Sequence, residues 1–205
     1  MMRTVLISAL LIIGVAQANA AEDTRNTDPT AFINQFSQVS IDDILNANID
    51  TVEKTARFRT LFNDSFDIPA ISRFVLGRAW RRASDAEKQD FLAVFEDVIV
   101  YTWSRRFRQY MGQTIKVLGT SPDGDTGTLV DSVIVHLEGQ TISVQWRLRQ
   151  RGEGLRIVDI IIEGISMVIT YRQDYTSVIR QNGGIQGLLT ELRKQAAEML
   201  PSKAP

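Results

Sequence analysis

Four stretches in the middle of the chain alternate apolar and polar residues, and a turn signal follows each of the first three. They read TIKVLG (114–119), TLVDSVIVHL (128–137), TISVQWRLR (141–149) and LRIVDIIIEG (155–164). Alternation with a period of two is typical of half-buried strands, and short turns containing Gly join neighbouring strands as hairpins. The sequence therefore predicts a small antiparallel sheet of about four strands over residues 114–163.

The predicted strands differ in how they face the rest of the protein. The third stretch has one apolar and one polar face, which is typical of a sheet with one buried side. Its apolar face carries Ile142, Val144, Trp146 and Leu148. The fourth stretch is apolar on both faces around residues 160–162, so we expect it to be more deeply covered. Residues 121–125 contain Pro and Gly and are expected to form a turn.

Helical periodicity dominates on both sides of the predicted sheet, over residues 28–112 and 166–200. Asp28, followed by a proline, is a helix start, and Ser84 opens a capping box ahead of a long helix expected to reach Met111. That helix is apolar over more than the ~100° stripe of a surface helix, so it should be covered on more than one side. Helices, then a meander of strands, then helices predict an α+β domain.

The composition excludes several classes of site. Hydrophobic residues make up 44% and charged residues 23%, a balance typical of an ordered globular protein. The net charge of -1 disfavours nucleic-acid binding over the whole surface. With no Cys and 1 His, the chain is not expected to form disulfides, catalytic thiolates, cysteine zinc sites or multi-histidine metal sites.

The first twenty residues are predicted to be a cleaved secretory signal peptide, leaving a single mature domain over 21–205. Arg3 precedes an uncharged apolar run over residues 5–15. The run is shorter than the ~20 residues needed to span a bilayer. Small residues then offer cleavage after Ala20 or Ala18. The mature chain is therefore expected outside the cytoplasm.

Two arginine clusters are candidates for binding a phosphate head group or docking a partner. A plain solvated face, with favourable charge at a helix C-terminus, is the alternative. Arginine forks match the geometry of phosphate and carboxylate oxygens, which supports the functional interpretation. The clusters are Arg78, Arg81 and Arg82, and Arg105, Arg106 and Arg108.

Candidate catalytic groups are few. His136 lies in the second predicted strand, and Asp131 and Asp159 lie in neighbouring strands. Together with a Tyr, His136 and Asp159 would form an acid–base set of the kind found in apolar, cone-shaped enzyme cavities. The alternative is that His136 faces solvent and Asp159 forms local contacts. The glycines of residues 183–187 lack the Lys-Ser/Thr of a phosphate loop and follow a helix, so they are interpreted as a helix break.

At this level of detail the chain resembles the toluene-tolerance family, the MlaC-like periplasmic phospholipid-binding proteins of the Mla intermembrane lipid-transport system. The resemblance runs from Phe66 to Leu192, and it depends on the order and spacing of its motifs. The residues that carry it are Phe66-Asp67, Leu76-Gly77, Trp80, Ala83-Ser84, Phe91, Phe95, Glu163-Gly164, Ser166, Tyr171-Arg172 and Gly184-Ile185.

The resemblance implies a fold, a cargo and partners. The fold would be a small curved sheet, similar to the NTF2-like cone, wrapped by helices around an apolar cavity. The protein would be a monomeric periplasmic carrier with no catalytic role, metal or cofactor, and with phospholipid as its cargo. It would exchange lipid with an inner-membrane ABC transporter containing an MCE-domain subunit and with an outer-membrane lipoprotein–porin complex. A hopanoid carrier of the same layout and an NTF2-like enzyme using a carboxylate and a Tyr are the alternatives.

The residues expected to line the lipid pocket come from the inward stripes and, for some, from the resemblance. They are Phe74, Leu76, Trp80, Phe91, Phe95, Val98, Ile99, Trp103, Val144, Trp146, Leu148, Ile160, Ile162, Met167 and Tyr171.

Overall fold

The computed structural model describes residues 27–200, so the predicted signal peptide lies outside the described residues. The helices before the sheet are α2 (Pro29–Gln38), the π-helical η1 (Val39–Leu45), α3 (Thr51–Ser65), α4 (Ile68–Leu76), α5 (Arg78–Arg82), α6 (Asp85–Ser104) and the 3₁₀ turn η2 (Arg105–Gln109). The strands are β1 (Thr114–Asp123), β2 (Gly127–Val135), β3 (Thr141–Arg151), β4 (Gly154–Ile162) and β5 (Ile165–Ser166). Helices α7 (Met167–Gln181) and α8 (Ile185–Met199) follow them. The predicted α+β class is confirmed.

The sheet is an antiparallel meander in the order β1-β2-β3-β4-β5, and only the two-residue β5 adds to the four strands predicted. The predicted turn at 121–125 is wrong in its first residues. Strand β1 continues through Pro122, which lies opposite Thr128, and ends at Asp123. Proline is tolerated there because β1 is an edge strand, where the missing N–H faces no partner.

A β-bulge at Val158 explains why β4 is apolar on both faces. Leu148 pairs with Ile157, but Arg147 pairs with Asp159, so β4 has one residue more than its partner at this point. Directly paired residues lie on the same face of a sheet. The bulge therefore keeps Ile157 on the inner face and places Ile160 there as well, while Asp159 pairs with Arg147.

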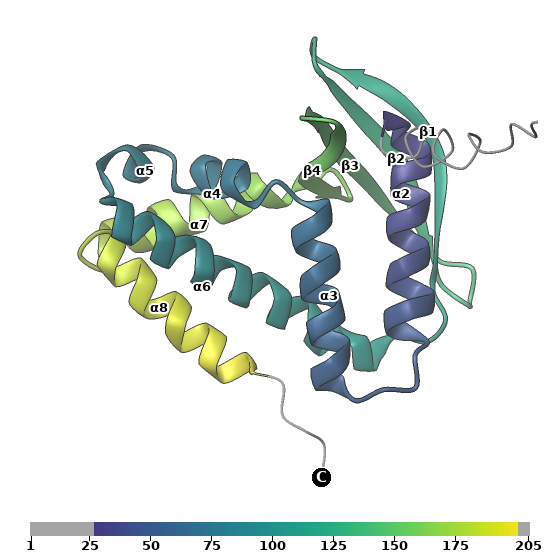
Figure 1. Cartoon of the computed structure of the whole chain (residues 1–205), viewed down its shortest axis with the longest axis horizontal. Helices are drawn as coiled ribbons and strands as arrows, with labels where there is room; N and C mark the ends of the chain where they lie inside the picture. Colours follow the sequence, from purple (N-terminus) through teal and green to yellow (C-terminus); the bar gives the residue numbers. More distant parts are fainter. Residues whose placement is uncertain (1–26, 201–205) are drawn as a thin grey trace, which may run out of the picture.

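Two hydrophobic cores hold the domain together. One lies among α4, α6, α7 and α8, with Phe91, Val100 and Leu189 fully buried. The other lies between α2 and the inner face of the sheet, around Ile33 and Leu148. Figure 1 shows α2 lying along the sheet, the bundle of α4–α8 to one side, and α3 standing between the two. No helix within residues 27–200 is long and apolar enough to cross a membrane.

The predicted helix starts are confirmed, but the end of the long helix differs. Asp28 accepts a hydrogen bond from the Ala31 N–H, and Ser84 forms the full capping box with Glu87. Helix α6 stops at Ser104 instead of reaching Met111, and the chain tightens into η2. The tighter turn brings the Phe107 ring edge-on to Phe58, with centroids 5.4 Å apart.

Candidate functional site

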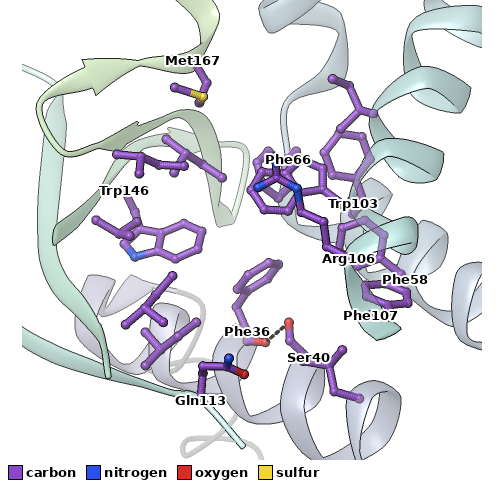
Figure 2. A pocket seen from close by; sticks show the side chains of 18 of the residues that line it. Phe36, Ser40, Phe58, Phe66, Trp103, Arg106, Phe107, Gln113, Trp146 and Met167 are labelled. Carbon is purple, nitrogen blue, oxygen red and sulfur yellow. Dashed lines mark hydrogen bonds between the residues drawn. The ribbon is translucent and has the colours of Figure 1, made fainter. Parts of the chain in front are cut away.

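A cavity of about 400 Å³ lies between the inner face of the sheet and the helices. Its walls are almost entirely apolar, and its size is that of a small-molecule or lipid site. Figure 2 shows Trp146 and Trp103 on opposite sides of the cavity, with Met167 toward one end and Gln113 toward the other. Among its described lining residues, Arg106 and Gln109 are exposed, so the cavity reaches solvent beside η2.

The sheet wall is built by alternation along β3 and β4. Val144 and Trp146 line the cavity from β3, and Ile160 and Ile162 line it from β4. The polar atom of Trp146 is satisfied away from the cavity, because its Nε1 donates to Ser132 Oγ at 2.9 Å. The indole can therefore offer an apolar face to a ligand at no cost in unmade hydrogen bonds.

The helical wall is a connected set of phenylalanines. The Phe36 ring lies edge-on to Trp146, with ring centroids 5.4 Å apart. It also lies edge-on to Phe66, with ring centroids 6.0 Å apart. Phe62 packs against Phe66, with ring centroids 4.5 Å apart, and Phe58 stacks on Phe62. These rings come from α2, α3 and the residue after α3, so the wall depends on the packing of α3 between the sheet and the bundle.

Polar side chains gather at the η2 side of the cavity. Gln113 Oε1 accepts from the Met111 N–H at 2.8 Å, which leaves Gln113 Nε2 directed toward His136 Nδ1 at 3.5 Å. The Arg106 guanidinium lies 5.1 Å from the centre of the Trp103 ring. Within residues 27–200, Arg106 has no ion-pair partner. The mouth thus offers hydrogen-bond donors and one positive charge.

Asp159 is engaged in holding the start of α7. It is 3% exposed. One oxygen accepts from Ser166 Oγ at 2.6 Å, and the other accepts from the Val168 N–H at 3.2 Å. A carboxylate bound in this way caps a helix, as the local interpretation of Asp159 expected.

Burial raises the pKa of Tyr171, against the opposing effect of the Arg106 charge, so Tyr171 is a neutral wall residue. Within residues 27–200, no three His, Cys, Asp or Glu side chains group as metal ligands.

A family model described as MlaC protein matches residues 32–194. The chain belongs to the MlaC family. A solved structure with the same fold is the phospholipid-binding protein from Ralstonia solanacearum, determined in complex with a phospholipid. The two chains share 21% identity with a TM-score of 0.70, and the match covers 89% of this chain and 99% of that one.

In this MlaC-family fold, part of the predicted pocket set lines the cavity. The residues that do are Phe95, Ile99, Trp103, Val144, Trp146, Ile160, Ile162, Met167 and Tyr171.

The remaining predicted pocket residues lie outside the cavity, for identifiable reasons. Leu76, Phe91 and Val98 are buried in the helical core, and Leu148 is buried in the core beneath α2. Trp80 is half-buried, with the Lys88 ammonium 5.9 Å from the centre of its ring.

Phe74 is 41% exposed and faces a separate groove on the outer surface of the molecule. An apolar stripe indicates burial or contact, but it does not indicate which neighbour provides it.

Sequence reasoning missed much of the helical wall, the residues at the opening beside η2, and part of the sheet wall. The phenylalanines of α2 and α3 lie in the region of predicted helical periodicity, but nothing in their spacing distinguishes a cavity wall from an ordinary core. The missed residues include Phe36, Ile44, Phe58, Phe62, Phe66, Ile71, Phe107, Gln113, Ile115, Ile134, His136 and Ile142.

The two arginine clusters lie at opposite ends of α6 and do not form one ring. Arg78, Arg81 and Arg82 form the exposed helix α5, whereas Arg105 and Arg106 are exposed on η2. Arg108 also belongs to η2. The 20 residues of α6 separate the clusters by about 30 Å at 1.5 Å per residue. Among the five of these arginines whose side chains the structure describes, Arg106 is the one placed in the cavity lining.

Proposed function

We propose that the chain is a periplasmic carrier that holds the acyl chains of a phospholipid in this cavity and moves the lipid between membrane complexes. The observation that carries the proposal is a large apolar cavity, walled by rings and aliphatic side chains, that opens beside polar donors. The phospholipid held by the Ralstonia solanacearum protein of the same fold supports phospholipid as the cargo.

The energetics explain why such a carrier is needed. Two acyl chains hold about thirty methylenes, and exposing each to water costs ~0.8 kcal/mol, so free transfer costs on the order of 20 kcal/mol. A cavity nearly as apolar as a bilayer removes this barrier. It need not bind lipid more tightly than a bilayer does, because the carrier must also release its cargo.

Within this proposal Arg106 binds the phosphate of the head group at the mouth. Its guanidinium is exposed, lies beside Trp103 and has no ion-pair partner within residues 27–200. A guanidinium donates two parallel hydrogen bonds to phosphate oxygens, so it selects a phospholipid over an uncharged polycyclic lipid. The expected exchange partners are an inner-membrane transporter with an MCE-domain subunit and an outer-membrane lipoprotein–porin complex.

Native mass spectrometry of the protein purified without detergent tests the proposal. We expect a bound species with the mass of a diacyl phospholipid. Protein that carries no lipid, or that carries a hopanoid of defined mass, would refute it.

The Arg106 step has a matched control in its neighbour, because Arg105 is exposed but does not line the cavity. Arg106→Gln is expected to weaken retention of phosphatidylglycerol by about tenfold relative to Arg105→Gln, since a charge-assisted hydrogen bond contributes about 1.5 kcal/mol or more. Equal retention by the two variants would remove Arg106 from the head-group site.

A further inference from the structure

A second concave surface lies on the outside of the helical layer, away from the lipid cavity. It is a groove between α4 and α7, lined by Phe74, Ile169, Arg172, Gln173, Thr176 and Arg180. Its two large apolar side chains are unusually accessible, since Phe74 is 41% and Ile169 48% exposed. Large apolar groups exposed together and surrounded by polar ones are typical of a binding surface.

Two exposed arginines without carboxylate partners, Arg172 and Arg180, line this groove. Four more exposed arginines lie close in sequence to Phe74, on α4 and α5; they are Arg73, Arg78, Arg81 and Arg82. In the part of the chain that the structure describes, none of them forms an ion pair, whereas Arg59, Arg147 and Arg151 do. The groove therefore carries two unpaired positive charges in a chain whose net charge is -1. Helix α7 also carries one exposed acidic residue, Asp174, against its two exposed arginines Arg172 and Arg180.

The contact between Arg172 and the end of α4 fixes the shape of the groove. The Arg172 guanidinium lies 4.8 Å from the centre of the Phe74 ring. The same guanidinium lies 3.2 Å from the point where a Cβ on Gly77 would stand. Gly77 has a φ of 53°, a left-handed conformation that favours glycine. The turn between α4 and α5 thus holds a cation over the aromatic floor of the groove.

The groove and the lipid cavity share the helices α4 and α7, and they are lined by different residues of each helix. Met167, Val168 and Tyr171 line the lipid cavity from α7, and Ile71 lines it from α4. A partner seated in the groove would therefore press on the helices that form one wall of the lipid site.

We propose that the α4–α7 groove docks an acidic segment of the protein that exchanges lipid with this carrier, an inference that rests on the proposed function. The segment would place an apolar side chain between Phe74 and Ile169 and carboxylates against Arg172 and Arg180. Charge complementarity identifies the partner as acidic. The concave shape favours a protein segment over a bilayer, because insertion into lipid requires apolar groups that protrude.

The test measures binding kinetics to the immobilised periplasmic part of the MCE-domain subunit, at several salt concentrations. Arg172→Gln/Arg180→Gln is compared with Arg57→Gln/Arg193→Gln, which removes the same charge from exposed ion pairs elsewhere. We expect the groove variant to associate about tenfold more slowly, with a weaker salt dependence, because steering acts on the association rate. Phe74→Ala should instead raise the dissociation rate, because it removes an apolar contact.

The possible outcomes separate this inference from the carrier function. Native mass spectrometry should show unchanged phospholipid occupancy in both arginine variants. Kinetics equal to the control variant would overturn the docking groove and leave the carrier function standing. The groove would equally be refuted if its variant lost binding only to vesicles of phosphatidylethanolamine and phosphatidylglycerol (3:1), which would identify a lipid surface as the occupant. A wild-type protein without bound phospholipid would instead refute the carrier function.

Discussion

A carboxylate placed on the cavity wall should make lipid binding depend on pH. Ile160 is suited to this test because it lines the cavity from β4 and is only half-buried. In the empty Ile160→Glu protein, water in the cavity can hydrate the new carboxylate, so folding should survive. When acyl chains fill the cavity, the carboxylate loses that water and takes a proton, because burying an unpaired charge costs more.

The size of the effect follows from the ordinary pKa of glutamate. Protonating a group with a pKa of about 4.3 at pH 7 costs about 3.7 kcal/mol, at about 1.36 kcal/mol per pH unit. Lipid binding should therefore weaken by about 500-fold at pH 7, and by only about fivefold at pH 5. The neutral Ile160→Gln variant should weaken binding by an amount that does not change between the two pH values.

The assay reloads delipidated protein with dioleoylphosphatidylglycerol at pH 7 and pH 5 and measures occupancy by native mass spectrometry. Val133→Glu is the matched control, because Val133 is half-buried on β2 and does not line the cavity. Circular dichroism confirms that each variant is folded. Full loading of folded Ile160→Glu protein at pH 7 would show that this wall does not contact acyl chains.

Two further predictions concern stability. Tyr175→Phe should leave the free energy of unfolding unchanged or raise it by about 1 kcal/mol in urea titration, because the buried Tyr175 hydroxyl has no hydrogen-bond partner within residues 27–200; a loss above 1 kcal/mol would contradict this. Burial alone would raise the pKa of Asp123, but hydrogen bonds from Arg149 and Arg147 outweigh it and lower that pKa. The resulting stability is present above pH ~4 and is lost as the pH falls through the folded-state pKa. Asp123→Asn should therefore lower Tm at pH 7 and flatten its fall between pH 4 and pH 2, and a parallel pH dependence would count against the ion pairs.

The strands were predictable because their signals are local. Each hairpin of the meander joins neighbours in sequence, and alternation along β3 sets the inner face that carries Val144 and Trp146. The bulge at Val158 was not predictable, because residues 160–162 are all apolar, so polarity does not show which of them point to the inner face. The continuation of β1 through Pro122 was also not predictable, because proline occurs both in turns and in edge strands.

The cavity itself was less predictable than the fold, and α6 shows why. Phe91, Phe95, Ile99 and Trp103 follow one another at intervals of four and form a single stripe. Phe91 is part of the helical core and does not line the cavity, whereas the other three line it. Each step of four residues turns the helix by only about 40°, so Phe91 and Phe95 lie on nearly the same side and differ mainly in their position along the axis. That position matters only relative to neighbouring elements, and no periodicity within α6 reports it.

The cavity exists because two cores meet without merging. The bundle core and the sheet core are separate sets of buried residues, and Phe66 packs against both. At the same junction the Asp67 N–H donates to the Ile157 carbonyl at 3.0 Å, and Phe66 pairs with Ile157 as an isolated bridge. The helical layer is thus joined to the sheet through the backbone at Phe66 and Asp67. Because this junction holds the two layers in place, the space beyond Phe66 can stay open for cargo while the cores on either side keep their packing.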